Sequence, residues 1–217
     1  MLLAAVGLLI WLFQDPRFYL YEVQVVGASQ VSADDVRRAA GMDEFSIFYV
    51  NRRQVEQTVS GQVIGVASVQ VDCQLPARLR IQVREHEVRF VWHTGGVGFL
   101  VDVDGRVIKP DTGSHPALVV IRDLDNQPLQ PGDRVEEAAL RTVHGLAGLL
   151  PSAVAFEYSA ENGVSWVDPS GLRTYFGDDQ LLDSKVACRH AVLEKAVAAG
   201  QQLQFIDVRF LNSPYYQ

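Results

Sequence analysis

Apolar and polar residues alternate along the chain between Ala67 and Val83. Odd positions are apolar from Ala67 to Leu75 and again from Leu79 to Val83, and most even positions are polar or charged. Successive side chains of a strand point to opposite faces, so this pattern predicts two strands with one apolar and one polar face. Pro76 cannot donate to a ladder and suits the turn between the strands. We therefore expect an antiparallel pair.

The segment before this pair predicts one strand and two helices. Residues 18–26 are rich in aromatic and β-branched residues and end at Gly27, which indicates a strand. Each helix follows a polar N-cap and ends at a glycine. The helices are expected from Ser32, with Asp35 at the third position, to Gly41, and from Asn51, with Gln54 at the third position, to Gly61. Two amphipathic helices can cover one face of a three-stranded sheet, which completes a two-layer β-α-α-β-β domain.

Shorter strands predominate from about residue 88 onward, and we place a domain boundary between residues 88 and 89. Turn sequences such as Asp104-Gly105 and Asn162-Gly163 separate short apolar runs. Strands are expected at residues 90–92, 98–103, 106–108, 117–121, 154–158, 164–167, 172–176 and 203–211, and helices at 133–151, capped by Asp133 with Glu136 at the third position, and at 178–200. The fold class is α+β, with one domain at residues 17–88 and an antiparallel α+β domain at residues 89–217.

The chain starts with thirteen residues, Met1 to Phe13, that are apolar apart from Gly7. A helix of this length rises roughly 20 Å, less than the roughly 30 Å hydrocarbon core of a bilayer. Lys and Arg are absent before Arg17, so the basic region of a secretory signal is missing. We expect residues 1–14 to be the second half of a transmembrane anchor that starts upstream of Met1. A buried helix and a signal remnant remain alternatives.

Composition and charge limit the kinds of partner and of cysteine chemistry that we expect. The 217 residues carry a net charge of -7, and no basic run supplies a field for phosphates, so nucleic acid is not an expected partner. The two cysteines, Cys73 and Cys188, are too far apart in sequence for a CxxC motif and are expected to be two separate buried thiols.

No motif for catalysis, metal or cofactor binding is found in the sequence. Asp102-Val-Asp104-Gly lacks the further ligands of a calcium loop and indicates a hairpin turn. The five histidines show no metal-ligand spacing, and Ser165 and Ser170 lack a nucleophile elbow. The glycines between Gly95 and Gly98 lack the lysine of a phosphate loop. We therefore expect a non-catalytic protein without a cofactor, metal or small-molecule substrate.

Three segments resemble a known family of bacterial cell-division proteins. The first is Phe18 to Gly41, with its Val-x-Val-x-Gly strand end followed by Ser-Ala-Asp-Asp-Val; the second is Val66 to Glu85, with Leu-Pro-Ala-Arg-Leu-Arg-Ile; the third is Leu100 to Val107. They are similar to the FtsQ family, called DivIB in Gram-positive species, which combines a POTRA domain with a C-terminal β domain. One departure is Val63 to Val66, where the family usually has Pro-Trp-Val.

The resemblance implies a role as well as a fold. A family member is a single-pass membrane protein with most of its chain outside the cytoplasm, concentrated at the division septum. It is a divisome scaffold that binds other membrane division proteins, of the FtsB and FtsL type, and links division-site assembly to septal peptidoglycan synthesis. The alternatives are a POTRA-containing polypeptide-transport protein, which would place its POTRA modules before a large β-barrel, and a secreted adaptor.

The resemblance also implies that the partner binds at the C-terminal strand. Alternation in residues 203–211 places Ile206, Val208 and Phe210 toward the core, and a last strand has a free edge that can template another strand. The candidate partner-binding residues are Asp207, Arg209, Phe210, Leu211, Asn212, Ser213, Tyr215 and Tyr216. A frayed tail and a covered strand remain the alternative. Removing residues 212–217, or placing charges at Leu211 and Tyr215, is expected to abolish binding with near wild-type thermal unfolding.

A second candidate surface lies on the first domain. Arg78, Arg80 and Arg84 occupy polar positions of the predicted strand after Pro76 and give it a basic face on an acidic protein. POTRA modules bind extended partners by adding a strand at an exposed edge. These arginines are a possible contact surface, and simple solvation of the three side chains is the alternative.

Overall fold

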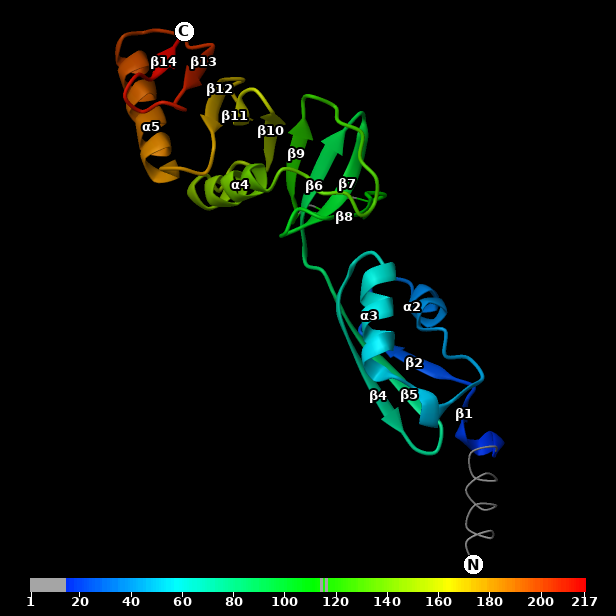
Figure 1. The fold of residues 1–217 in the computed structure, drawn as a ribbon. Coiled ribbons are helices and arrows are strands. Elements are labelled where there is room, and N and C mark those ends of the chain that lie inside the picture. Colours follow the sequence, from blue (N-terminus) through cyan, green and yellow to red (C-terminus); the bar gives the residue numbers. More distant parts are fainter. Residues whose placement is uncertain (1–14, 114, 116) are drawn as a thin grey trace, which may run out of the picture. The chain divides into compact units, whose positions relative to one another are not determined.

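The computed structural model describes residues 15–113, 115 and 117–217 (Figure 1). The chain divides into two compact units, the first ending at His86 and the second beginning at Glu87. The anchor predicted at residues 1–14 lies outside the described residues. Among those that are described, no helix combines the length and the apolar character needed to cross a membrane.

In its described part, the first unit contains two α-helices packed on a small sheet. Its elements are η1 (Pro16–Phe18), β1 (Tyr19–Leu20), β2 (Val23–Val26), α2 (Ala33–Ala40), β3 (Phe45–Ser46), η2 (Ile47–Tyr49), α3 (Arg52–Gln62), β4 (Val66–Gln74) and β5 (Arg78–Glu85). The described strands of this sheet have the order β2-β5-β4. The predicted antiparallel pair is confirmed, and β2 runs parallel to β5. The strand predicted at residues 18–26 is divided, because β1 leaves this sheet and pairs with β3.

The predicted apolar positions form the core of this unit. Leu79, Ile81 and Val83 are buried against Val36 and Val59 of the two helices. Helix α3 starts as expected, with the Asn51 side chain accepting a hydrogen bond from the N–H of Gln54 at 3.3 Å. Gly27 has a φ of +88°, and a Cβ there would lie 2.3 Å from the carbonyl oxygen of Val83. Only glycine allows this close approach of loop and strand.

Glu85 ties the end of β5 to the start of α2. Its carboxylate accepts hydrogen bonds from the backbone N–H groups of Ser29, Gln30 and Val31 at 2.7 to 3.1 Å. Burial raises the pKa of this carboxyl, but the hydrogen bonds from Val31, Ser29 and Gln30 outweigh that effect, so the pKa lies below its usual value. The bond between strand and loop therefore depends on the charged form of Glu85.

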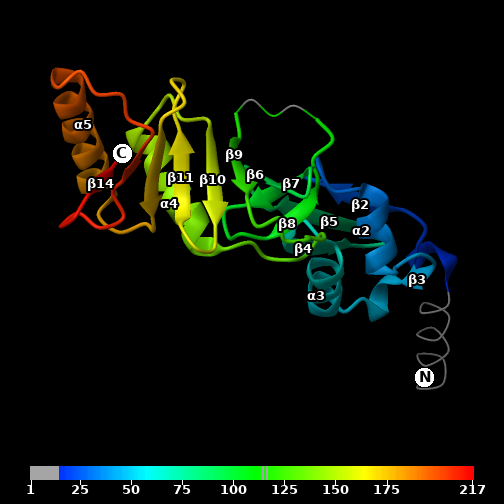
Figure 2. The same cartoon turned by 90° about the horizontal axis from the view of Figure 1, so that it is seen from above.

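The second unit is built on a large sheet. Its elements are β6 (Val88–Thr94), β7 (Val97–Asp102), β8 (Val107–Pro110), β9 (Val119–Asp123), α4 (Glu137–Leu149), β10 (Ala155–Ser159), β11 (Gly163–Val167), β12 (Arg173–Gly177), α5 (Leu182–Ala198), β13 (Phe205–Asp207) and β14 (Tyr215–Tyr216). Within the described residues the sheet has the order β14-β13-β12-β11-β10-β9-β6-β7-β8 (Figures 1 and 2). The α+β fold class is confirmed, and the boundary predicted at residues 88 and 89 falls inside β6.

The large sheet is mixed, whereas the sequence predicts an antiparallel one. Strands β6 and β9, β9 and β10, and β12 and β13 pair in parallel. A parallel pair needs a long crossover, and α4 and α5 provide two of the three. Helix α4 starts later than predicted: Glu136 is its N-cap, and Asp133 accepts a hydrogen bond from the N–H of Gln130 at 2.7 Å instead. Helices α4 and α5 share one hydrophobic core with the buried side chains of the sheet, such as Phe156 and Phe176.

Candidate partner-binding edge

The large sheet ends at β14, which pairs antiparallel with β13. The paired residues are Ile206 with Tyr216 and Asp207 with Tyr215. One position further along, Phe205 and Gln217 exchange two backbone hydrogen bonds, each of 3.3 Å. Hydrogen-bonded and non-bonded pairs alternate along an antiparallel ladder, so the adjacent pair, Ile206 and Tyr216, is a non-bonded one. The N–H and C=O of Tyr216 therefore lie in the plane of the sheet and point away from β13, toward the position that a further strand would occupy.

The last strand is shorter than predicted. Of residues 203–211, only Phe205–Asp207 form β13, and a turn follows in which the N–H of Ser213 donates to the carbonyl of Phe210 at 3.1 Å. The Asp207 carboxylate accepts a hydrogen bond from the N–H of Arg209 at 3.0 Å, which bends the chain directly after β13. The edge of β13 that was expected to be free is therefore covered by β14, and the open edge belongs to β14.

This turn changes which side chains face the core. Ile206 and Val208 are buried, as the alternation predicts, but Phe210 is 70% exposed where a core position was predicted. The alternation holds only while the strand continues, and the chain leaves the strand before Phe210. Leu211 is half-buried, and Asn212 and Ser213 are exposed.

Asp207 and Arg209 form an internal ion pair. The Arg209 guanidinium donates to the Asp207 carboxylate through Nε at 3.0 Å and Nη2 at 2.6 Å, and through Nη1 to the side-chain amide oxygen of Asn162, Oδ1, at 2.8 Å. Burial raises the pKa of Asp207, but the hydrogen bonds and charge of Arg209 lower it below its usual value. Hydrogen bonding to Asp207 raises the pKa of Arg209. The pair thus holds the turn after β13.

Three aromatic rings form a row across the last three strands, and this row was not predicted. The ring centroids of Tyr175 and Phe205 are 6.1 Å apart, and those of Phe205 and Tyr215 are 5.5 Å apart. The Arg209 guanidinium lies 5.6 Å from the Tyr175 ring centre. The only sequence signal is the alternation within each strand, which does not say which strands are neighbours. The row leads to the open edge, where Tyr215 is 59% exposed.

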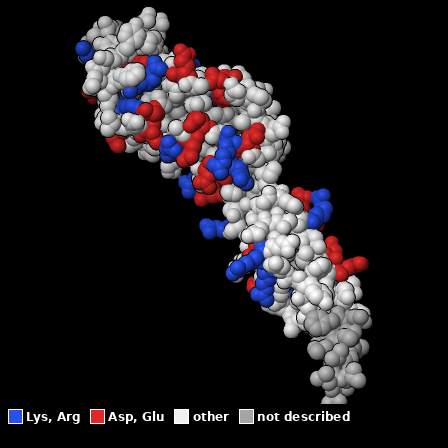
Figure 3. Space-filling view, in the orientation of Figure 1, with Lys and Arg blue, Asp and Glu red and all other residues white. Residues whose placement is uncertain are grey.

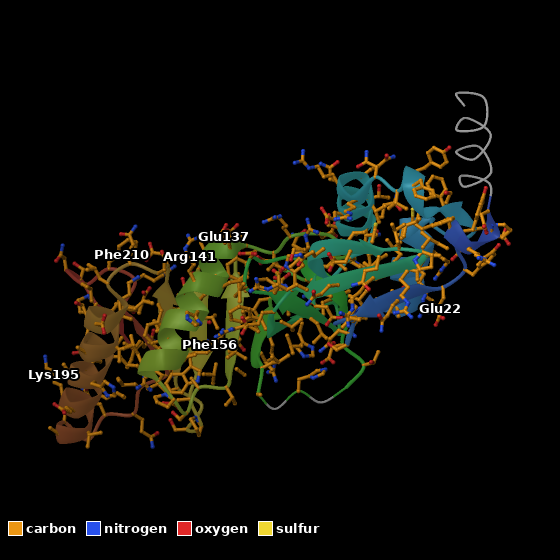
Figure 4. The ribbon with its side chains drawn as sticks, turned by 90° about the horizontal axis from the view of Figure 1, so that it is seen from below. Glu22, Glu137, Arg141, Phe156, Lys195 and Phe210 are labelled. Carbon is orange, nitrogen blue, oxygen red and sulfur yellow. The ribbon has the colours of Figure 1, made fainter. Side chains whose placement is uncertain are left out.

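A hollow of 380 Å³ lies next to Phe210 within the second unit. Its lining includes Tyr158, Asn162, Lys185 and Arg209. The Lys185 side chain is buried, and its Nζ lies 2.6 Å from the Asp178 carboxylate. This hydrogen bond lowers the pKa of Asp178 below its usual value. Figure 4 shows Phe210 at the surface, so its exposed ring borders a hollow that is lined by both apolar and charged residues.

The second candidate surface lies on the first unit. Arg78, Arg80 and Arg84 are exposed on β5, the middle strand of the small sheet. In the register with β4, Arg80 lies opposite Asp72 and Arg84 opposite Ser68. The three arginines therefore share their face with polar and acidic side chains.

The remaining sequence predictions concern structural positions. Asp102 accepts hydrogen bonds from the N–H groups of Asp104 and Arg106 at 3.0 and 2.7 Å, so this motif is the predicted hairpin turn. Cys73 and Cys188 are free thiols, half-buried rather than buried.

Comparison with known proteins finds a domain family and two similar proteins. Residues 18–86 match the model of the FtsQ-type POTRA domain. Proteins named cell division protein FtsQ from Chloroflexus aurantiacus and Chloroflexus aggregans are 28% and 27% identical to this chain, and each match covers 93% of this chain and 74% of the relative. The first unit is therefore an FtsQ-type POTRA domain, and the chain as a whole is similar to proteins named cell division protein FtsQ. This similarity includes the second unit, because the matches to the two relatives extend far beyond the POTRA domain.

Proposed function

We propose that this FtsQ-family protein is a non-catalytic scaffold of the cell-division machinery that binds a partner segment as an added strand beside β14. The partner is a membrane division protein of the FtsB and FtsL type. The observation that carries the proposal is the open edge of β14, where the N–H and C=O of Tyr216 point away from β13 and the neighbouring Tyr215 is exposed. Exposed Phe210 lies in the turn between β13 and β14. Leu211, Asn212 and Ser213 lie in the adjacent turn and would contact the partner there.

Side chains must supply most of the affinity. A backbone hydrogen bond contributes a net 0.5–1.5 kcal/mol, so the two groups of Tyr216 provide about 1–3 kcal/mol. A micromolar complex needs about 8 kcal/mol. Tyr215 and Phe210 are the exposed aromatic residues at this edge, and aromatic residues are common anchors of interfaces. The Asp207–Arg209 ion pair acts indirectly, by holding the turn that presents Phe210.

The wider role follows from the family. Residues 1–14 serve as the membrane anchor, residues 17–88 as the POTRA domain and residues 89–217 as the domain that binds the partner. Both domains lie outside the cytoplasm, and the protein concentrates at the septum, where it links division-site assembly to septal peptidoglycan synthesis. On the face of the second unit seen in Figure 3, acidic and basic side chains are mixed, which fits recognition by an edge strand better than by a field of one charge.

The test compares two aspartate substitutions with a matched control. Phe210→Asp changes an exposed residue, so the free energy of unfolding should stay within about 0.5 kcal/mol. Tyr215→Asp also removes the ring contact with Phe205, so the free energy of unfolding should fall by about 0.5–1.5 kcal/mol and the variant should stay folded. Loss of an aromatic anchor should weaken binding of a C-terminal FtsB-type peptide at least about 30-fold, measured by calorimetry. Val154→Asp, at a residue of the same unit that is 68% exposed, should bind like wild type. Unchanged affinity in both aspartate variants would place the site elsewhere.

The POTRA surface has its own test. We propose that Arg78, Arg80 and Arg84 contact a second partner across the open face of the small sheet. Reversing all three charges should reduce recruitment of the protein to the division site without changing the affinity for the FtsB-type peptide. Normal recruitment would indicate that the three side chains are only solvated.

A further inference from the structure

Four large apolar side chains are exposed at one end of the first unit. Tyr21 is 69% exposed, Tyr49 65%, Leu75 68% and Phe45 38%. We call these four residues the apolar collar. They come from the β1–β2 link, the end of η2, the β4–β5 turn and β3. Four large apolar side chains from four segments are more than scattered single exposed residues, and such a group indicates an interaction surface.

Backbone contacts bring these segments to the same end of the unit. Leu20 pairs with Phe45, and the N–H of Glu44 donates to the carbonyl of Leu20 at 2.8 Å. The rings of Phe18 and Phe48 lie 4.9 Å apart. Glu22, next to Tyr21, lines the same hollow as Gln74, the last residue of β4, and Ala77 of the β4–β5 turn. In Figure 1 β1 and the β4–β5 turn lie together at the start of the described chain.

The collar is not needed for the core of its own unit. Its chain neighbours Leu20 and Ile47 are turned inward and are 0% and 7% exposed. The collar side chains point the other way and remain in water unless something outside the unit covers them. Tyrosine, with an apolar ring and a polar hydroxyl, suits a boundary between an apolar and a wet phase.

We propose that the apolar collar inserts into the lipid headgroup layer of the membrane, an inference that rests on the proposed anchoring by residues 1–14. The apolar run ends at Phe13, so four residues, 14–17, separate it from Phe18 at the base of the collar. The five residue-to-residue steps from Phe13 to Phe18 span at most about 18 Å. The polar layer on each side of a bilayer is about 5–8 Å thick, and tyrosines concentrate there. A short link therefore holds the collar against that layer.

Charge defines the kind of lipid surface that fits. Charges of both signs surround the collar: Asp15, Glu22, Asp43 and Glu44 lie in or beside its segments, as do Arg17, Arg52 and Arg53, and Arg78 and Arg80 line the same hollow as Glu22. A rim of mixed charge gives anionic lipid no net attraction, and exposed charges are screened by salt. The collar therefore binds through its rings and Leu75, to a zwitterionic lipid surface. Contact at this end would fix the tilt of the POTRA unit on the membrane.

The test uses the full-length native protein in phosphatidylcholine vesicles that contain a phosphatidylcholine with a diazirine near its carbonyl groups. Lipid adducts are mapped by mass spectrometry after photolysis. Adducts are expected on residues 1–13, and also on peptides that contain Tyr21, Tyr49 and Leu75. The triple variant Tyr21→Ser, Tyr49→Ser and Leu75→Ser changes exposed residues, so it should fold normally, keep the adducts on residues 1–13 and lose those on the collar.

The control and the contrary outcomes separate this inference from the anchor. Ile64→Ser, at an exposed residue of the link between α3 and β4, should leave the collar adducts unchanged. Adducts on residues 1–13 without adducts on the collar would overturn the inference and leave the anchor standing. No adducts on residues 1–13 would overturn the anchor and the inference together. Collar adducts that form only when anionic phosphatidylglycerol is added would show that charge, and not the aromatic rings and Leu75, drives the contact, and would overturn the inference.

Discussion

The two edges of the large sheet are protected in different ways. At β8 the loop that follows β9 lies along the edge: the N–H of Val107 donates to the carbonyl of Asp133 at 2.9 Å, and the N–H of Gly132 donates to the carbonyl of Val107 at 2.8 Å. Pro110, the last residue of β8, has no N–H to offer. At β14, by contrast, Tyr216 directs its backbone groups outward. Among the described residues, one edge is closed by its own chain and the other is open.

The comparison separates stability from binding. An unprotected edge is an aggregation hazard, and natural proteins commonly cover it or keep it short. The β14 edge is short, with two residues, and Pro214 precedes it. A short edge pairs poorly with arbitrary strands because it offers few hydrogen bonds. Selectivity for a partner would therefore depend on the exposed rings of Tyr215 and Phe210.

The largest effect is expected from removing residues 212–217. This deletion takes away β14, uncovers β13 and removes Tyr216 from the core. We expect the free energy of unfolding to fall by roughly 2–4 kcal/mol and peptide binding to be lost. Urea unfolding and calorimetry measure the two effects. Wild-type stability, which the sequence alone predicts for this deletion, would mean that β14 does not pack on the unit as described.

A substitution at the closed edge should affect stability alone. Gly105 has a φ of +81°, and a Cβ there would lie 3.2 Å from the carbonyl oxygen of Val135 in the covering loop. Gly105→Ala is expected to cost roughly 1–3 kcal/mol and to leave peptide affinity unchanged. Gly171→Ala is the matched control, because Gly171 has a φ of +89° but no heavy atom within 4 Å of the added Cβ. Equal losses in both variants would show that only backbone strain matters.

The smallest effect concerns the ion pair behind the open edge. The pKa of Asp207 is lowered in the folded state, so its charge stabilises the protein above its ordinary value of 3.8, and this contribution is lost as the pH falls through the folded pKa. Asp207→Asn should therefore be less stable than wild type by about 1 kcal/mol at pH 7, with the difference shrinking below pH 4. Glu194→Gln, at an exposed residue of α5, should show no such trend. A difference for Asp207→Asn that is independent of pH would contradict this role.

Much of the fold could be predicted because local patterns determine it. The alternation around Pro76 and the N-cap at Asn51 are local signals, and both are confirmed. The parallel pairings could not be predicted, because alternation records which face a side chain takes but not which strand lies beside it. The last strand was predicted too long because residues 203–211 keep alternating, while side-chain hydrogen bonds of Asp207 end the strand.

The candidate site was predicted in part for the same reason. Tyr215 and Tyr216 do form the edge of the sheet, but Tyr175 and Phe205 join them only through pairing of strands that lie far apart in the sequence. Arg209 was expected to face a partner, and its guanidinium is instead bound to Asp207 and Asn162. Such contacts depend on the tertiary fold and leave no local pattern.

The central claim is that a partner strand pairs with the outward backbone groups of β14. Amide hydrogen exchange of the full-length protein, followed residue by residue with and without a saturating FtsB-type peptide, tests it most directly. We predict that the Tyr216 amide is poorly protected alone and becomes strongly protected on binding, while the Phe205 amide, already bonded to Gln217, changes little. Peptide binding that leaves exchange at Tyr216 unchanged would contradict the account.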